Sequence, residues 1–436
     1  MEPLFCDPPR HLAVAVSGGA DSMALVWLIK EWSNTTAGRI TALTVDHGLR
    51  PGSAEEATQV AKWMAAWDVP HHKLLWRGEK PSTGIQEAAR TARYTLMSAW
   101  CRENGVDALV LAHHREDQAE TFLMRLLRGS GPDGLAAMRP LTSLNGVRIV
   151  RPLLDVAKES LVSILQDIGQ AWIEDPSNHD AGFTRVKVRE WMPGLEAHGI
   201  DAGRLGALSG AFGLLRFQLE DMTAEAVGSL VHFDPGGWAE VPRSVIQTAP
   251  EILARRMLRS VLKSVGGSGH APRSGRMARG LQHLRSQDSF KAFSLGGCVV
   301  LEKNHKVMIL REERRGTPPL KVEAGDRIVW RNRYLCAFGG EETAGRPPYT
   351  VAPLSAAGWA QLLQWEPNLR NSGVFHACAA TLPALYDGNG LLEIPRFGLR
   401  RPSGPEEGKG TNTGSVRFET AHFFPDFEEL DARWSL

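Results

Sequence analysis

The chain has 436 residues, of which 43% are hydrophobic and 23% are charged, a composition typical of an ordinary soluble protein. This length exceeds what a single hydrophobic core usually serves, so we expect two or three domains. Five cysteines with no CxxC spacing give no disulfide framework, zinc site or iron–sulfur motif. The sequence shows no signal peptide and no stretch that could span a bilayer, so we expect a cytoplasmic protein with no membrane partner.

The net charge of +1 conceals an uneven distribution of charge along the chain. Residues 251–315 hold 14 Lys and Arg against 5 Asp and Glu, whereas the stretch from Gly404 holds 3 against 7. Nucleic-acid binding depends on local basic patches, so a near-neutral total does not exclude it. The basic stretch is either a solvated helix face or a surface for RNA.

Strand and helix patterns alternate over roughly the first 200 residues. The expected strands are HLAVAV, RITALTVDH, HHKLLW and ALVLAH, and the expected helices are Asp21–Trp32, Ala54–Trp67, Ile85–Arg102 and Arg115–Arg128. This order predicts an α/β domain over residues 1–200, with a parallel, Rossmann-like sheet flanked by helices. Ligands of such sheets bind at the carboxyl ends of the strands.

The pattern changes beyond about Asp201. A long helix is expected to link domains over residues 201–225, and residues 226–315 mix short strands with the basic helix EILARRMLRSVLKSV. After a break rich in Gly and Pro, short strands such as DRIVW and RYLCAF predict a β-rich domain over residues 320–436. The α/β domain is therefore followed by two smaller domains, the first α+β and the second β-rich.

A glycine-rich hexapeptide, Ser17-Gly18-Gly19-Ala20-Asp21-Ser22, follows the first strand and opens a helix. Two glycines allow a tight turn and a close approach to a phosphate, while successive N–H groups and the helix dipole attract an anion. The Gly-Lys-Ser/Thr of a Walker A loop is missing, which disfavours a kinase or GTPase. The hexapeptide therefore predicts a phosphate site rather than a plain β–α turn.

The segment HHREDQAET follows the fourth strand, so it lies at the same edge of the sheet. Asp117 and Glu120 stand three residues apart and share one helix face. Two carboxylates beside a triphosphate suit Mg²⁺ or a substrate amine, and acids at a helix N-terminus are also favoured by the dipole alone. His113 is either a catalytic group or an ordinary histidine at a strand end.

Two further segments carry arginines at helical spacing. Arg90 and Arg93 lie in GIQEAARTARY, and Arg185 and Arg189 follow the turn WIEDPSN. Each pair is either part of a solvated, salt-bridged helix face or a set of contacts to phosphates of ATP or RNA.

These motifs together carry a resemblance to known proteins. The hexapeptide SGGADS resembles the pyrophosphate loop (PP-loop) of the N-type ATP pyrophosphatases. Taken in order, SGGADS, DHGLR, GIQEAARTARY, HHREDQAET, RPLL and WIEDPSN are similar to the motifs of the tRNA(Ile)-lysidine synthetases, and they span most of the first 190 residues. This chain departs from the family pattern at Glu116, where Asp is common, and at Val186, where Asn is usual.

The resemblance implies an ATP-dependent ligase that attaches free L-lysine to the wobble cytidine of the CAU anticodon of tRNA(Ile). By position, ATP would be bound by Ser17, Gly18, Gly19, Ala20, Asp21 and Ser22. Mg²⁺ would be held by Asp21 and Asp117. The catalytic residues would be Asp21, His113, Asp117, Glu120 and Arg189. Arg185 would help to hold the substrates. Apart from the resemblance, the arginine spacing in GIQEAARTARY predicts Arg90 and Arg93 as contacts to substrate or tRNA phosphates, and the basic stretch 251–315 predicts Arg255, Arg256 and Arg259 as contacts to tRNA.

The alternative within the same ATP-binding family is a tRNA thiolase. Thiolases relay sulfur through cysteines or an iron–sulfur cluster, and no cysteine of this chain lies in a paired or loop motif. From another class, an RNA-binding protein with a degenerate ATP fold is disfavoured by the intact SGGADS and HHREDQAET. The sequence leaves open whether the protein is a homodimer and how tRNA(Ile) would be told from tRNA(Met).

Overall fold

The computed structural model describes residues 9–36, 38–49, 52–78, 80–174, 184–267, 272–286, 288–312, 318–339, 349–371, 376–402 and 417–423. Two of the sequence motifs are partly outside these ranges, DHGLR at Arg50 and WIEDPSN from residue 175 onwards. The chain divides into two compact units, Met1–Gln218 and Leu219–Leu436, which we describe in turn.

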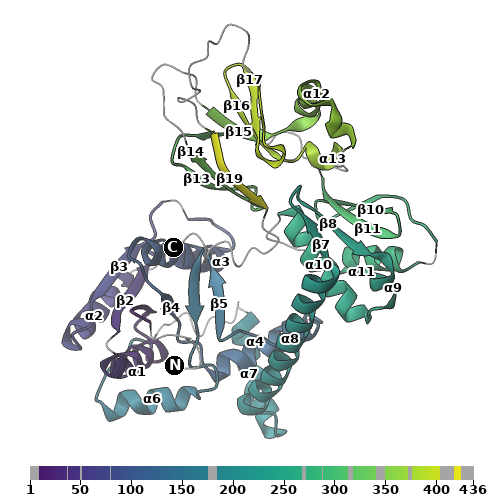
Figure 1. Cartoon of the computed structure of the whole chain (residues 1–436). Coiled ribbons are helices and arrows are strands. Elements are labelled where there is room, and N and C mark those ends of the chain that lie inside the picture. Colours follow the sequence, from purple (N-terminus) through teal and green to yellow (C-terminus); the bar gives the residue numbers. More distant parts are fainter. Residues whose placement is uncertain are drawn as a thin grey trace. The chain divides into compact units, whose positions relative to one another are not determined.

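A six-stranded sheet forms the centre of the first unit (Figure 1). Its strands are β1 (His11–Ala15), β2 (Arg39–Asp46), β3 (His71–Leu75), β4 (Ala108–Val110), β5 (Leu141–Leu144) and β6 (Val147–Val150). Their order is β3-β2-β1-β4-β6-β5, with all pairs parallel except the β5–β6 hairpin. The strands β1 and β4 are almost fully buried, as expected for a parallel sheet that is covered on both faces.

Helices cover both faces of this sheet. The unit contains the helices α1 (Ala20–Thr36), α2 (Ser53–Ala66), α3 (Ile85–Glu103), α4 (Arg115–Leu127), α5 (Pro132–Leu135), α6 (Lys158–Asp167) and α7 (Thr184–Ala197). Side chains of α1, α2 and α6 pack with Leu12 and Val14 of β1, whereas α3 packs with Ala13 on the opposite face. Successive residues of a strand point to opposite faces, so β1 contributes to both layers of the core. The predicted α/β fold is confirmed.

The long helix α8 (Ala202–Leu230) follows. It begins as expected near Asp201 and continues five residues past the expected end at residue 225. None of the helices among the described residues is long and apolar enough to cross a membrane.

The second unit is built from antiparallel sheets and short helices. Its first sheet has the order β7-β8-β11-β10-β9, with the strands β7 (His232–Asp234), β8 (Trp238–Pro242), β9 (Phe293–Leu295), β10 (Cys298–Lys303) and β11 (Lys306–Arg311). The helices that pack with it are α9 (Arg243–Thr248), α10 (Glu251–Gly266) and α11 (Ser274–Arg285). This part is α+β, as the sequence predicted.

The remainder of the second unit is rich in β-strands. A five-stranded sheet has the order β12-β15-β16-β17-β18, with β12 (Leu320–Val322), β15 (Tyr349–Pro353), β16 (Pro383–Asp387), β17 (Gly390–Ile394) and β18 (Leu399–Arg400). A three-stranded sheet contains β13 (Arg327–Trp330), β14 (Tyr334–Gly339) and β19 (Arg417–Phe423). The short helices are α12 (Ser355–Trp365), α13 (His376–Ala379), η3 (Pro367–Asn371) and η4 (Pro395–Phe397). The β-rich character is confirmed, and the domain boundaries stay predictions.

Candidate active site at the carboxyl edge of the parallel sheet

The glycine-rich loop lies between β1 and the start of α1. Gly18 has a φ of +89°, which favours glycine, and a Cβ atom there would come within 2.8 Å of the Ile173 side chain. The Ser22 hydroxyl donates to the Gly19 carbonyl at 2.9 Å and accepts from the Ser17 amide at 3.2 Å. These contacts fix the loop at the N-terminus of α1, where N–H groups and the helix dipole attract an anion.

A cavity of about 210 Å³ opens at this loop. It is bounded by the carboxyl ends of β1, β2 and β4 and by one side of α3. Its polar lining consists of Ser17, Gly19, Asp21, Ser22, Arg90, Arg93, Tyr94 and His113. The structure therefore brings four residues of the glycine-rich loop together with three candidates from separate motifs, Arg90, Arg93 and His113.

His114 joins three carboxylates beside the loop, whereas the predicted catalytic residue was its neighbour His113. The Nε2 atom of His114 lies 3.4 Å from Asp21 Oδ2 and 3.5 Å from Asp117 Oδ2, and its Nδ1 atom lies 2.8 Å from Glu116 Oε2. Burial opposes protonation, but the hydrogen bonds to Asp21 and Glu116 outweigh burial and raise the pKa of His114 to about 10. His114 is therefore a buried cation at pH 7.

Asp21 is ionised, and only one of its two carboxylate oxygens contacts His114. Burial disfavours its carboxylate form, yet the hydrogen bond and charge of His114 hold the pKa of Asp21 below its usual range. The Oδ1 atom is buried and has no hydrogen-bond partner among the described residues. Such an atom is costly in a folded chain and is typical of a site that a ligand completes.

Glu120 belongs to a second group of charges, one turn further along α4. Its side chain is only 4% exposed and accepts a hydrogen bond from Arg189 Nε, while Arg185 Nε lies 3.1 Å from its Oε2 atom. Arg185 Nη1 also lies 4.0 Å from Asp117 Oδ1. Burial raises the pKa of Glu120 in spite of the two arginines. Ion pairs thus connect α4 to α7 and bring together four of the candidate residues.

His113 lines the cavity. Burial is the main reason that its pKa is lowered to about 4, so the ring is neutral at pH 7. Its Nδ1 atom is buried with no hydrogen-bond partner in the described part of the chain. A neutral imidazole in this position can exchange a proton or a hydrogen bond with a ligand.

Arg151 is a second residue near the cavity that sequence reasoning missed. Its guanidinium is close enough to His113 and Tyr94 to affect the charge balance there, and burial lowers the pKa of Arg151. Its Nη1 atom donates to the Arg139 carbonyl at 2.9 Å. The motif RPLL, which begins at Arg151, was the available signal.

The predicted metal ligands Asp21 and Asp117 converge on the same imidazole atom. Among the described residues, no three His, Cys, Asp or Glu side chains gather as a metal-binding group. Two carboxylates are sufficient for Mg²⁺ when substrate phosphates supply further oxygens. The donor set and the unpaired Asp21 oxygen therefore fit a magnesium ion that arrives with ATP.

The remaining RNA candidates lie on α10, in the second unit. Arg259 is exposed, and Arg255 and Arg256 are half-buried. The other side of α10 is apolar and packs into the core through Met257, Val261 and similar residues. The arginines therefore lie on the outward side of an amphipathic helix.

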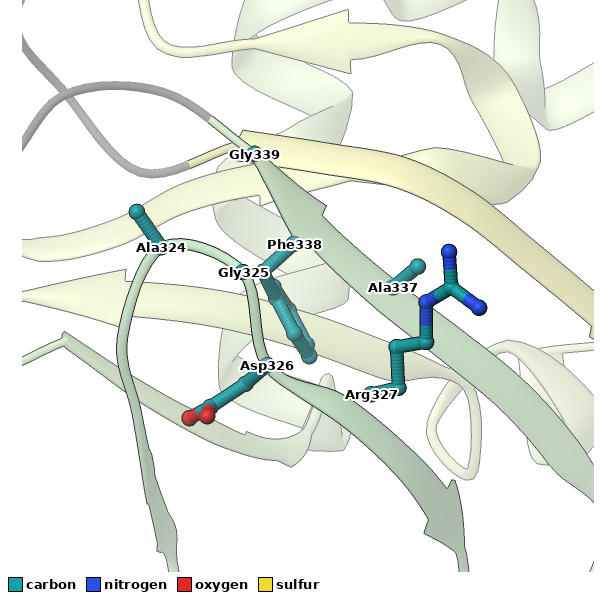
Figure 2. A pocket seen from close by; sticks show the side chains of 7 residues that line it. All are labelled: Ala324, Gly325, Asp326, Arg327, Ala337, Phe338 and Gly339. Atoms are coloured by element: carbon teal, nitrogen blue, oxygen red, sulfur yellow. The ribbon is translucent and has the colours of Figure 1, made fainter. Parts of the chain in front are cut away.

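A second cavity, of about 360 Å³, lies at the hairpin of β13 and β14. Figure 2 shows the Asp326 and Arg327 side chains extending from neighbouring positions there. Asp326 Oδ2 accepts from the Glu323 amide at 2.8 Å, so this carboxylate closes the turn before β13. The other lining residues are Ala, Gly and Phe, and none of them supplies a nucleophile or an acid–base group.

Comparisons with known proteins agree with this geometry. The PP-loop domain family matches residues 2–195. The tRNA(Ile)-lysidine synthase of Ruegeria pomeroyi is 38% identical over 392 residues, which cover 90% of this chain and 90% of that protein. The chain belongs to the tRNA(Ile)-lysidine synthase family. The family resemblance predicted from the motifs is therefore confirmed, and so is an enzyme of this type.

Other members of the family match over most of their length. The tRNA(Ile)-lysidine synthase of Mesorhizobium japonicum is 34% identical, over 90% of this chain and 86% of that protein. Among solved structures, the U34-tRNA thiolase NcsA from Methanococcus maripaludis with its 4Fe–4S cluster is 15% identical with a TM-score of 0.43, over 49% of this chain and 75% of that chain.

Proposed function

We propose that this enzyme attaches free L-lysine to C2 of the wobble cytidine in the CAU anticodon of tRNA(Ile), with ATP converted to AMP and pyrophosphate. The observation that carries the proposal is the cavity where the PP-loop, Asp21 and His113 meet beside the carboxylates of α4. ATP use follows from the PP-loop domain. The names of the relatives support the ligase reaction and its tRNA substrate.

In the first step, the cytosine C2 oxygen attacks the α-phosphorus of ATP and the bond to pyrophosphate breaks. Loop amides at the N-terminus of α1 stabilise charge on the departing phosphates. Arg90 and Arg93 line the same cavity and add positive charge to it. The wobble base reaches the pocket because an anticodon loop is single-stranded and its bases can be splayed out.

Asp21 and Asp117 are the residues that we assign to Mg²⁺. The unpaired Oδ1 atom of Asp21 and the shared contact with His114 support this assignment. When bound, the ion offsets negative charge on the phosphates. His114 holds the two carboxylates in position as a buried cation and is a positioning residue.

In the second step, the ε-amine of lysine attacks C2 and AMP leaves. Free lysine is mostly protonated at neutral pH, with a reference pKa near ~10.4. Glu120 is the partner that we assign to this ammonium, because a buried carboxylate whose pKa is raised by burial can bind a cation and then accept its proton. Arg185 and Arg189 neutralise Glu120 in the structure, and the ammonium would take the place of one of them.

A thiolase reaction is disfavoured by the environments of the cysteines. Cys101, Cys336 and Cys378 are buried, and burial raises the pKa of each thiol to about 12. The thiolate is the reactive form, so these three residues are poor sulfur carriers. Cys298 is also buried, and Cys6 lies outside the described residues.

One incubation tests the proposed reaction. Purified protein is mixed with ATP, Mg²⁺, isotope-labelled lysine and total tRNA, and the digested nucleosides are identified by mass spectrometry. We expect the label in lysidine derived from tRNA(Ile). If no lysine is incorporated and a parallel incubation with a sulfide donor yields a thiolated nucleoside, the result would instead support the thiolase reaction. The availability of tRNA and ATP also leads us to infer a cytoplasmic location.

A further inference from the structure

Three cations of the first unit each lie against a ring at one side of the active-site cavity. We call these six residues the aromatic rim. The pairs are Lys80 with Trp76, Arg90 with Tyr94, and Arg93 with His47. The Lys80 Nζ atom lies 5.5 Å from the centroid of the Trp76 ring. The Arg90 guanidinium lies 5.3 Å from the centroid of the Tyr94 ring. The Arg93 Nη2 atom lies 3.3 Å from His47 Nε2.

The rim is continuous with the cavity. Arg90, Arg93 and Tyr94 of α3 line the cavity directly. From Arg93 the contacts continue to the His47 ring and then to Trp76, whose ring centroid lies 5.9 Å from that of His47 in an edge-on arrangement.

Backbone contacts fix this arrangement at the end of two strands. The Trp76 amide donates to the Asp46 carbonyl at 3.0 Å, so β3 stays beside β2 beyond its last paired residue. The Lys80 Nζ atom lies near the same strand end, since a Cβ atom added at Gly48 would be 3.6 Å from it. The Trp76 and Lys80 pair therefore lies where β2 and β3 end, next to His47.

The rings of the rim are uncharged, so its positive charge comes from Lys80, Arg90 and Arg93. Burial is the main reason that the pKa of His47 is lowered to about 4, and Arg93 lowers it further. At pH 7 the neutral His47 accepts hydrogen bonds from Arg93 through Nε2. Neutral rings interleaved with fixed cations are typical of surfaces that bind single-stranded nucleic acid, with bases stacked on rings and phosphates paired with cations.

We propose that the aromatic rim binds the anticodon-loop nucleotides next to the wobble cytidine, with a base stacked at Trp76 and backbone phosphates paired with Lys80, Arg90 and Arg93. This assignment rests on the proposed function, which supplies the RNA. ATP alone accounts for the rim less well, because its phosphates are directed to the PP-loop and its single adenine needs only one ring. A short run of single-stranded RNA uses both the rings and the cations.

Variants of Trp76 and Lys80 test the assignment in the full-length protein. Binding of a fluorescently labelled CAU anticodon stem-loop is measured by anisotropy over a range of KCl concentrations, and the KM for ATP is measured by pyrophosphate release. Trp76→Leu should weaken stem-loop binding roughly tenfold, and Trp76→Phe should restore most of it because phenylalanine also stacks. A plot of the logarithm of the binding constant against the logarithm of the KCl concentration has a negative slope. In Lys80→Ala this slope should become shallower by about 0.7, the value for one phosphate contact to a single strand.

The matched control is the Trp27 and Lys30 pair on α1, where the Lys30 Nζ atom lies 5.2 Å from the Trp27 ring centroid. Trp27→Leu and Lys30→Ala remove the same kinds of group and should leave stem-loop binding as in the unmodified protein. The KM for ATP should stay within about twofold for Lys80→Ala and Trp76→Phe, and thermal unfolding confirms that each variant is folded.

Two results would overturn the assignment. The first is stem-loop binding that does not change in Trp76→Leu and Lys80→Ala. The second is a raised KM for ATP with unchanged stem-loop binding, which would make the rim an adenine site. If the unmodified protein formed no lysidine while the rim variants lost stem-loop binding, the proposed reaction would fail and the rim assignment would stand.

Discussion

At Asp21, one carboxylate oxygen contacts the buried His114 cation and the other has no hydrogen-bond partner among the described residues. Asp21→Asn keeps the shape of the side chain and removes its charge. We expect lysidine formation to fall at least ~100-fold, a loss typical of removing one electrostatic contact to a transition state. Binding of tRNA should change little, because its affinity comes mainly from basic surfaces. Nucleoside analysis and a tRNA binding assay measure the two quantities, and a parallel loss of both would contradict this division of roles.

Asp117 and Glu120 lie on the same helix in different surroundings. Asp117 shares His114 with Asp21, whereas Glu120 is paired with Arg185 and Arg189. Asp117→Asn should therefore impair pyrophosphate release even when lysine is absent. Glu120→Gln should still adenylate the tRNA and should raise the KM for lysine. Measuring tRNA-dependent pyrophosphate release with and without lysine separates these steps, and two variants blocked at the same step would indicate a joint role.

His113 makes the folded protein sensitive to acid. A histidine in the unfolded chain takes up a proton near pH 6.5, whereas His113 in the folded chain does so only near pH 4. Between these values the unfolded state binds more protons, so the free energy of unfolding falls as the pH drops from about 6.5 to about 4. In His113→Gln this loss should be smaller. Urea unfolding at several pH values tests the prediction, and an equal loss in both proteins would show that His113 does not contribute.

At the scale of single elements, the strands β1, β2, β3 and β4 and the helices between them could be predicted. The strands β1, β2 and β4 are rich in buried apolar residues, β3 ends in the apolar pair Leu74 and Leu75, and each helix has apolar residues at helical spacing, so local pattern was sufficient. The β5–β6 hairpin was not predicted, because Leu141–Leu144 is largely exposed and its sequence alternates weakly. Its pairing depends on β6 lying beside β4, which is a tertiary contact.

The outward side of α10 gives a prediction at the scale of the helix. Changing Arg255, Arg256 and Arg259 to Glu should weaken tRNA binding and flatten its salt dependence, because fewer counterions are released. ATP binding without tRNA should hardly change. Lys62→Glu, at an exposed position of α2, is a control for charge reversal on a surface outside α10. An unaltered salt slope would mean that α10 presents an ordinary solvated face.

Part of the candidate active site could be predicted from the sequence, and the rest depends on contacts between elements that are far apart in the chain. The glycine-rich loop, Asp117 and Glu120 could be chosen because their motifs follow strands of one sheet edge. Sequence could not tell His113 from His114, since adjacent residues of an extended segment point in opposite directions. Which of the two histidines contacts the carboxylates depends on Asp21, which reaches His114 from another element, α1. The His47 and Trp76 contact likewise exists only because β2 and β3 pair in register.

At the scale of the whole molecule, the proposed reaction requires that the tRNA is adenylated before lysine reacts. The most direct test is to incubate the protein with tRNA(Ile) bearing a CAU anticodon and ATP labelled at the α-phosphate, in the absence of lysine. We predict that label becomes attached to the tRNA with release of pyrophosphate, and that added lysine then releases labelled AMP and yields lysidine. Release of ADP, or label that stays on the tRNA after lysine is added, would contradict the account.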